Sequence, residues 1–278
     1  TGQPDRCRAR GYGPHAGRFL KRITESPAAT MTDTLSLVTY NIHKGFSQFN
    51  RRLMVHELRD RLRGLNPDLV FLQEVQGLHE QHAQKHANWP EQPQHEFLAD
   101  SVWSATYGQN VLYDHGHHGN AILSRYPIEH SHNQDVTHLS FEKRGLLHTQ
   151  ISWQGTIVHC VCAHLSLLAR SRKWQMAALA EEIDRLVPHD QPLIIAGDFN
   201  DWRNHASEHL ADRLQLTEVF DHLSGRPARS FPVALTMLRL DRIYVRGLKA
   251  VRADVHYGAG WSKISDHAAL RCELVLTG

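Results

Sequence analysis

The sequence predicts a single α+β domain in which short buried strands are combined with two long helices. Apolar runs bounded by Gly, Pro or polar residues, such as 192–198, are typical of strands buried on both faces. The segments 52–65 and 169–187 carry apolar residues at helical spacing among charged ones. Neither an internal repeat nor a convincing linker interrupts residues 35–276, so one domain is the better interpretation.

Composition restricts the class of protein. With 41% hydrophobic and 22% charged residues, the chain of 278 residues is ordinary for a protein with a real core. It has no apolar run near the roughly 20 residues that a membrane helix needs, and its N-terminus lacks the apolar block of a secretory signal. Its four cysteines form no CxxC pair and no disulfide-framework spacing. We therefore expect a cytoplasmic protein without a transmembrane segment, and a monomer.

The N-terminal segment differs in charge from the rest of the chain. Residues 1–30 are rich in Gly, Pro and Arg, and they hold six basic and two acidic residues. We interpret them as a disordered basic extension, or as sequence upstream of a natural start at Met31, so that the domain covers 31–278. Without them the totals of 31 basic and 29 acidic residues fall to 25 and 27, a net charge of −2. This body lacks the basic surface of a dedicated nucleic-acid binder, although a local basic rim is left open.

The first half of the domain predicts a parallel pair of strands around a helix. A strand at 35–42 reaches Asn41, and an amphipathic helix at 52–65 ends at Asn66-Pro67. A second buried strand at 68–75 ends in a carboxylate, Glu74. Two core strands that flank one helix resemble a βαβ unit, which places Asn41 and Glu74 at corresponding strand ends.

The next segment is polar and less regular. Residues 76–96 predict a loop with room for a short helix, and a second short element is expected at 96–103. A short strand at 119–125 follows. Histidines gather here: those at 79, 82 and 86 are interpreted as solvated side chains, and those at 115, 117 and 118 as loop residues.

The second half is rich in strands. A hairpin is predicted from 146–151 and 156–163, and its second strand runs into His164. The helix at 169–187 leads to the strand at 192–198, after which the chain turns polar. After a polar helix and loop, two further strands are expected at 240–245 and 268–276.

Polar residues recur at the ends of these strands, as they do in a site built from many loops. They are Asn41, Glu74, His164, Asp198, Asn200, Asp241, Asp266 and His267. If the chain stays extended after the strand at 192–198, Asp198 and Asn200 point to the same side and fit a cation- or water-holding site. A plain turn is the alternative for this pair. Further alternatives are a turn at Asn41, a surface ion pair of Asp241 with Arg242 or Arg239, and a satisfied buried histidine at 164.

Seven short motifs resemble, in order, those of the endonuclease/exonuclease/phosphatase superfamily, whose members include DNase I-like nucleases, neutral sphingomyelinases and inositol-phosphate phosphatases. The motifs are Tyr40-Asn41-Ile42, Leu72-Gln73-Glu74-Val75, Asn120-Ala121-Ile122-Leu123-Ser124, Ala163-His164-Leu165, Gly197-Asp198-Phe199-Asn200, Leu240-Asp241-Arg242-Ile243 and Ser265-Asp266-His267. The resemblance covers essentially all of 35–276. Within the superfamily, the chain is most similar in type to the short bacterial cytoplasmic members. It implies a DNase I-like four-layer α/β/β/α sandwich, with two mostly antiparallel sheets face to face and helices outside.

The same resemblance implies roles for the polar residues. Glu74 resembles the principal Mg²⁺ ligand, with Asn41 and Asp266 close by, and such hard oxygen ligands also suit Mn²⁺. Asp198 resembles the group that orients or deprotonates the attacking water, and Asn200 the group that holds that water or the phosphate. His267, with its tautomer fixed by Asp241, and His164 resemble histidines that face the phosphate. Three further substrate-phosphate contacts are suggested at Asn120, Arg144 and His118, with a surface arginine and a loop histidine as the plain alternatives for the last two.

The implied function is metal-dependent hydrolysis of a phosphodiester, or a phosphomonoester, by in-line attack of water. The substrate class stays open between nucleic acid, cut by a Mg²⁺-dependent endonuclease or exonuclease, and a phospholipid headgroup. Segments such as Asn-Ala-Ile-Leu-Ser-Arg-Tyr-Pro-Ile and Arg-Leu-Asp-Arg-Ile are similar to the lipid- and GPI-related branch of the superfamily. A catalytically silent binding module is the least favoured reading, because it would leave gaps among the eight polar residues and there is none.

Overall fold

In the computed structural model, which describes residues 34–48, 51–258 and 260–277, the strands pair into two six-stranded sheets. The prediction for residues 1–30 lies outside this part of the chain, and the domain boundary at residue 31 stays a prediction. The first sheet has the order β11-β12-β1-β2-β4-β3, with β1 at Leu35–Asn41, β2 at Leu69–His79, β3 at Ser104–Tyr113, β4 at Gly116–Ser124, β11 at Leu248–His256 and β12 at Ala269–Leu276.

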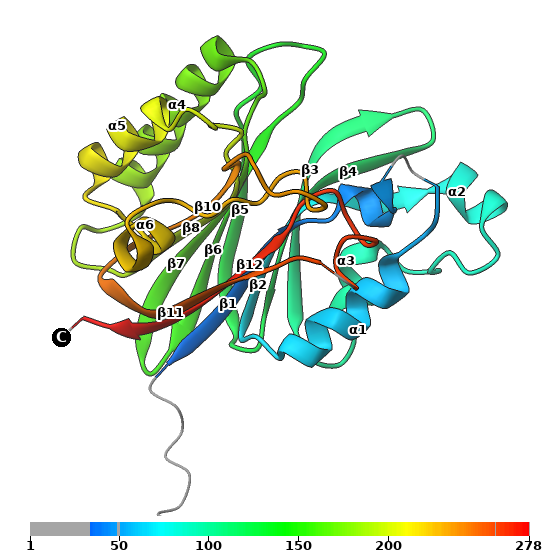
Figure 1. Cartoon of the computed structure of the whole chain (residues 1–278), viewed down its shortest axis with the longest axis horizontal. Coiled ribbons are helices and arrows are strands. Elements are labelled where there is room, and N and C mark those ends of the chain that lie inside the picture. The colour runs from blue at the N-terminus through cyan, green and yellow to red at the C-terminus, as the bar shows by residue number, and fades with distance from the viewer. Residues whose placement is uncertain (1–33, 49–50, 259, 278) are drawn as a thin grey trace, which may run out of the picture. The chain divides into compact units, whose positions relative to one another are not determined.

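The second sheet has the order β5-β6-β7-β8-β10-β9 (Figure 1). Its strands are β5 at Ile128–Asp135, β6 at Gly145–Trp153, β7 at Thr156–His164, β8 at Leu193–Asp198, β9 at Thr217–Glu218 and β10 at Asp241–Arg246. Neighbours β1 and β2 are parallel, as are β7 and β8, and the other pairs in this part of the chain are antiparallel. The parallel β1–β2 pair joined by a helix confirms the βαβ expectation.

Most helices lie on the outer faces of the two sheets (Figure 1), whereas the one at Val219–Ser224 packs Val219 and Phe220 into the core between them. The helices are η1 at His43–Gly45, α1 at Val55–Leu65, α2 at Glu80–Lys85, α3 at Gln94–Ala99, α4 at Ala169–Leu186, α5 at His205–Leu214 and α6 at Val219–Ser224. The predicted helix at 52–65 therefore begins three residues later than expected, and the element expected at 96–103 is α3. Among the described residues, no helix combines the length and apolar character needed to cross a membrane.

Three apolar cores lie between these layers. Leu37 and Phe71 of the first sheet pack with Ile194 and Ile243 of the second, so the two sheets share one core. A second core joins the first sheet to α1 and α3, and a third joins the second sheet to α4 and α5. In β8 the odd residues Leu193 and Ile195 face the helices, while Ile194 and Ala196 face the other sheet. The four-layer α/β/β/α arrangement is therefore confirmed, and so is the burial of this strand on both faces.

The predicted strands are the inner ones. All eight strands expected from the sequence lie inside the two sheets, whereas β3, β5, β9 and β11, which were not expected, are the four sheet edges. Edge strands have one unpaired side and can expose most of their side chains, so they need no apolar run. The strand β5, Ile-Glu-His-Ser-His-Asn-Gln-Asp, is mostly exposed and polar.

Candidate active site

Three of the predicted residues lie side by side at one edge of the second sheet. In the register of the sheet, Asp198 at the end of β8 is paired with His164 at the end of β7 and with Asp241 at the start of β10. The β7–β8 pair is parallel and the β8–β10 pair is antiparallel, so an end and a start meet at the same edge. Backbone pairing alone thus gathers residues that are separated by up to 77 positions in the sequence.

Asn41 connects this edge to the first sheet. Its Nδ2 donates to Oδ2 of Asp198 at 3.1 Å and contacts Oε1 of Glu74 at 3.3 Å. Asn41 is buried, and its backbone carbonyl accepts a hydrogen bond from the hydroxyl of Ser265 at 2.7 Å. A single carboxamide therefore contacts carboxylates of both sheets, while its Oδ1 accepts from the backbone N–H of His43 at 3.1 Å, so Asn41 is a turn residue as well as a member of the cluster.

Glu74 does not end its strand as the sequence suggested. The strand β2 continues to His79, and the register with β4 shifts between Leu72 and Val75. Glu74 has φ of 57° at this irregularity, a conformation that is uncommon for a residue other than glycine. A β-bulge re-aims a side chain that would otherwise follow the regular alternation. The bulge brings the Glu74 carboxylate to Asn41, where strand periodicity would not place it.

Asn200 is both a turn residue and a member of the cluster. Its φ of 52° shows that the chain is not extended there, so the expected same-side geometry of Asp198 and Asn200 is wrong. Its backbone N–H donates to Oδ1 of Asp198 at 3.0 Å, as in an Asx turn, and its Nδ2 donates to the carbonyl of Leu165 at 3.0 Å. The turn fixes one carboxylate oxygen of Asp198 and leaves the other towards Asn41.

His267 and Asp241 form a buried pair. The Nδ1 of His267 lies 2.8 Å from Oδ2 of Asp241, and the backbone N–H of His267 donates to the hydroxyl of Ser265. Asp241 is fully buried and makes no surface ion pair, which corrects that alternative. Burial opposes a charged imidazole, but the carboxylates of Asp241 and Asp198 outweigh it and raise the pKa of His267. His267 is therefore held as the imidazolium.

Asp198 lies between two histidines, of which one is protonated and the other is neutral. Its Oδ2 is 3.7 Å from Nε2 of His267 and 3.6 Å from Nε2 of His164. Burial raises the pKa of Asp198, and the imidazolium of His267 and the hydrogen bond from Asn41 oppose this rise. Burial also holds the pKa of His164 well below its usual value, with Arg144 and His267 adding to the effect. His164 is thus a neutral imidazole.

Asp266 contacts His43, two positions after Asn41. Its Oδ1 is 3.5 Å from Nδ1 of His43, whose backbone N–H donates to Oδ1 of Asn41 at 3.1 Å. Among the residues that the structure describes, Asp198, Asp241 and His267 have ligand-type atoms within 4.8 Å of one another. In this group Asp241 and His267 already bond to each other.

The three expected substrate contacts line one small hollow together with two members of the cluster. This hollow is bordered by Glu74, His118, Asn120, Arg144 and His164. His118 lies within β4 and not in a loop, as does His117, which corrects that expectation. Asn120 donates through Nδ2 to the carbonyls of Gly145 and Cys162, so its amide nitrogen has a structural task.

Sequence reasoning missed several residues that hold this hollow in place. Glu142 lies 2.9 Å from a guanidinium nitrogen of Arg144 and also accepts from the hydroxyl of Ser166. Lys44 is close enough to His118 to help burial lower its pKa to about 4. Ser265 tethers Asn41, as described above. The Ser265 signal was present in the Ser-Asp-His motif, whereas nothing in the sequence around Glu142 or Lys44 marks them.

The histidines of the 79–86 segment are not simply solvated. The rings of His79 and His82 stack with centroids 3.6 Å apart, and both line a hollow of about 300 Å³ with Phe46 and Tyr113. Burial lowers the pKa of His82 to about 4 and lowers that of His79 as well, which favours the neutral form of both rings. Contacts between aromatic rings thus connect these histidines.

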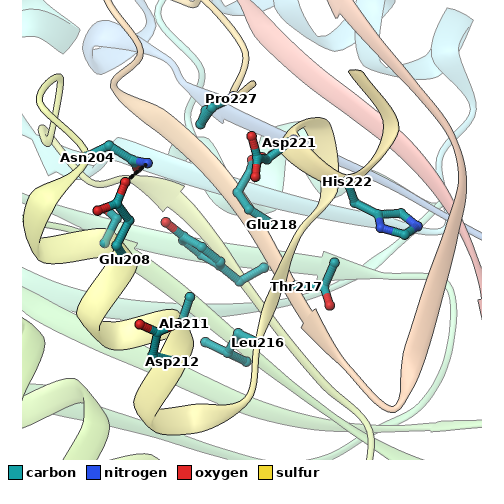
Figure 2. A pocket seen from close by; sticks show the side chains of 12 residues that line it. Asn204, Glu208, Ala211, Asp212, Leu216, Thr217, Glu218, Asp221, His222 and Pro227 are labelled. Atoms are coloured by element: carbon teal, nitrogen blue, oxygen red, sulfur yellow. Dashed lines mark hydrogen bonds between the residues drawn. The ribbon is translucent and has the colours of Figure 1, made fainter. Parts of the chain in front are cut away.

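Two larger hollows lie away from the cluster. One of about 480 Å³ lies between α4 and α5, and the other, of about 450 Å³, lies between α5 and α6. Figure 2 shows the second, whose lining includes Glu208, Asp212, Glu218 and Asp221. Neither is lined by any of the eleven residues that the sequence analysis singled out.

Comparisons with known proteins agree with this geometry. A curated relative, the uncharacterized protein YbhP of Escherichia coli (strain K12), is 47% identical over 253 residues, which cover 90% of this chain and 100% of that protein. The human Nocturnin catalytic domain with bound sulfate has a TM-score of 0.69 at 18% identity, covering 88% of this chain and 95% of that one. Danio rerio TDP2 complexed with a single-strand DNA product has a TM-score of 0.64 at 18% identity, covering 87% and 98%.

A solved endonuclease/exonuclease/phosphatase from Beutenbergia cavernae has a TM-score of 0.69 at 19% identity, covering 88% of this chain and 72% of that one. At these identities the solved structures show a shared fold. The model of the Endonuclease/Exonuclease/phosphatase family matches residues 38–267, which is most of the chain and includes every member of the cluster. The chain therefore belongs to the Endonuclease/Exonuclease/phosphatase family.

Proposed function

We propose that this protein is a divalent-metal-dependent phosphoesterase that hydrolyses a phosphodiester by in-line attack of water. Members of the family are typically hydrolases of phosphate esters and commonly use divalent metal ions. The observation that carries the proposal is the position of Asp198. Its carboxylate is buried between the imidazolium of His267, the neutral ring of His164 and the amide of Asn41.

Asp198 is the group that orients the attacking water and accepts its proton. Burial raises its pKa, which makes the carboxylate a stronger base than an exposed aspartate. The backbone N–H of Asn200 donates to Oδ1 and the Nδ2 of Asn41 donates to Oδ2, so the carboxylate is held in one orientation and each oxygen keeps a further lone pair for a water molecule. Asn200 thereby sets the orientation of the carboxylate as well as offering its own carboxamide oxygen to the water or phosphate.

His267 is the group that stabilises charge on the phosphoryl oxygens. Asp241 holds its Nδ1, which leaves Nε2 to donate a proton or a hydrogen bond to the substrate. His164 is a neutral imidazole and can donate a hydrogen bond to a phosphoryl oxygen. As a neutral ring it attracts the Asp198 carboxylate less than the imidazolium of His267 does. Asp241 acts through His267 and is a positioning residue.

Glu74, Asn41 and Asp266 are the residues that would hold Mg²⁺ or Mn²⁺. Their oxygen atoms are hard ligands, and Glu74 and Asp266 are partly exposed, so substrate and water can reach them. A bound cation would supply charge stabilisation at the phosphate oxygens. Arg144, His118 and Asn120 border the same hollow as Glu74 and are the proposed contacts of the remaining phosphate oxygens.

The proposal is tested with the purified full chain and bis-p-nitrophenyl phosphate. We expect hydrolysis that is lost on chelation and restored by Mg²⁺ or Mn²⁺, and an Asp198→Asn variant with a rate lower by about 10²–10⁴-fold. Near-normal metal-dependent hydrolysis by Asp198→Asn would overturn the assignment of the base. A panel of abasic duplex, single-stranded DNA, RNA, sphingomyelin, cardiolipin and inositol phosphates then separates the nuclease alternative from a lipid substrate.

A further inference from the structure

Five large apolar side chains are exposed on three neighbouring segments at the catalytic end of the second sheet. Their exposed fractions lie between 42% and 78%. They are Phe141, Leu167, Leu168, Trp174 and Trp202, which we call the docking face. Contiguous exposed apolar side chains mark an interaction site more often than isolated ones do.

Contacts between the segments hold the docking face together. Glu142, next to Phe141, accepts from the backbone N–H of Leu167 at 3.3 Å. His138 contacts the ring of Trp174, with centroids 5.4 Å apart, and its Nδ1 lies 2.9 Å from the hydroxyl of Ser171. The guanidinium of Arg172 lies 5.3 Å from the ring centroid of Trp202. The segments 138–144, 165–174 and 199–204 therefore form one surface.

The charge displayed beside these apolar side chains is positive. Lys143, Arg170, Lys173 and Arg203 lie on the same three segments and are exposed. The two acidic residues of these segments are both engaged inward. Glu142 pairs with Arg144 at 2.9 Å, and Asp201 is buried with its carboxylate 3.6 Å from Arg172.

A hollow beside the docking face has the same amphipathic character. It lies between α4 and α5, has a volume of about 480 Å³, and is lined by apolar atoms of Met176, Ala180 and Leu210. Lys173 and Arg203 stand at its border. An apolar floor with a cationic border suits an anionic amphiphile, whose aliphatic part and headgroup differ in the same way.

We propose that the docking face binds the surface of an anionic phospholipid bilayer. Adjacent leucines and indole rings with nearby Lys and Arg are the combination that lies at a bilayer interface, with apolar groups below the headgroups and cations at their level. Single-stranded nucleic acid would use the tryptophans for stacking, but it offers no apolar phase for Leu167 and Leu168.

Docking in this orientation brings the candidate active site to the headgroup phosphates. Each of the three segments includes or adjoins a residue of the candidate site, namely Arg144, His164 and Asn200. That a headgroup phosphodiester is the substrate rests on the proposed function, whereas binding to the bilayer does not. The two claims can therefore fail separately.

The test is cosedimentation of the full chain with vesicles of phosphatidylcholine alone or mixed with phosphatidylglycerol. The double variant Leu167→Ser/Leu168→Ser removes apolar surface without changing charge, and Ser at position 168, the N-cap of α4, favours folding. We expect its partition onto mixed vesicles to fall by about tenfold or more. The matched control Leu223→Ser/Val251→Ser, also at exposed apolar side chains but outside the docking face, should bind as the wild type does.

A second variant separates charge from apolar contact. Lys173→Gln/Arg203→Gln should lower binding to mixed vesicles about tenfold at low salt and much less at high salt, because each cation near an anionic surface contributes electrostatically. The basic residues of 1–30 are present in every variant, so only differences between variants are compared.

Binding of the wild type that is equal to that of Leu167→Ser/Leu168→Ser, or no binding to mixed vesicles, would overturn the proposal. Binding to single-stranded DNA that depends on the same leucines, without vesicle binding, would assign the face to nucleic acid. Hydrolysis of bis-p-nitrophenyl phosphate should be equal in wild type and the double variant. If neither hydrolyses it while vesicle binding holds, the proposed function fails and the docking face stands.

Discussion

The candidate active site and the acidic hollow between α5 and α6 both collect carboxylates, but they are built differently. The hollow in Figure 2 is lined mostly by residues 204–227, with Tyr244 as the contribution of another strand. Its acids are bonded locally: Glu218 accepts from the backbone of Asp221, and Glu208 accepts from Asn204 at 3.1 Å. The cluster around Asp198 instead joins residues from both sheets, of which Asn41 and Asp198 are 157 positions apart.

The difference teaches that volume is a poor guide to chemistry in this fold. The acidic hollow holds about 450 Å³; Glu218 caps a helix and is half-buried, and the carboxylates of Glu208, Asp212 and Asp221 are exposed. The cluster is nearly filled by its own side chains, and its charges are buried against one another. Burying charge costs stability unless partners are fixed by the fold, so a buried network assembled from distant segments indicates function more strongly than an open acidic cavity.

The largest expected effect contrasts one glutamate from each region. Glu74→Gln should lower metal-dependent hydrolysis on the order of 10³-fold, because an amide is a weaker ligand than a carboxylate for a hard cation. Glu208→Gln in the acidic hollow should leave the rate within about twofold of the wild type. Steady-state rates over a Mg²⁺ titration measure both. Equal losses in the two variants would contradict the distinction between the regions.

The next effect concerns the buried pair. Asp241→Asn should lower kcat on the order of 10²-fold with little change in KM, because His267 loses the carboxylate that holds its charge and tautomer. Asp212→Asn, at an exposed residue of the acidic hollow, is the matched control. Unchanged far-ultraviolet circular dichroism would show that both variants fold. A normal kcat in Asp241→Asn would remove Asp241 from the proposed machinery.

A smaller effect is expected at the entrance of the site. Arg144→Lys keeps the positive charge but removes the planar fork that can hold two phosphate oxygens, so KM should rise about tenfold. Arg213→Lys is the control, since Arg213 pairs with Asp184 at 2.7 Å on the surface between α4 and α5. Substrate-saturation curves distinguish a change in KM from one in kcat. If both variants give the wild-type KM, Arg144 does not contact the phosphate.

The smallest effect is one of stability and belongs to the acidic hollow. Burial raises the pKa of Glu218 to about 7 from an ordinary value of 4.5. Stability is therefore lost as the pH rises from 4.5 through 7, where the unfolded chain is ionised and the folded carboxyl resists ionisation. Glu218→Gln should be more stable than the wild type by about 1–3 kcal/mol at pH 8 and similar to it at pH 4.5.

Urea unfolding at the two pH values measures this difference, and the exposed Asp212→Asn variant should show none. A gain in Glu218→Gln that is the same at both pH values would show that titration of this carboxyl is not its cause. Because Glu218 lies outside the cluster, hydrolysis by this variant should be unchanged, which again separates the two regions.

The candidate residues could be predicted from the sequence because most of them stand where an apolar run stops. Asp198 and His164 are the last residues of inner strands and Asp241 is the first residue of another. The register of the sheet then brings the three together. Glu74 was predicted as the end of its strand, which is wrong because the strand continues to His79. A bulge in the strand, and not a strand end, directs its carboxylate to Asn41. Glu142 and Lys44 were missed because their positions depend on how loops fold over the site, which no local pattern records.

The sequence by itself determined the inner strands, the two long helices and the family motifs, because burial on two faces leaves an apolar run and helical packing leaves a stripe. The tertiary structure decided the four edge strands, whose exposed and polar side chains carry no such signal. It also decided the turn at Asn200 and the protonation of His267 and His164. The turn at Asn200 is a local Asx turn that the sequence left as one of two alternatives. The shifted pKa values arise from burial and from charges on distant segments, and those contacts exist only once the chain has folded.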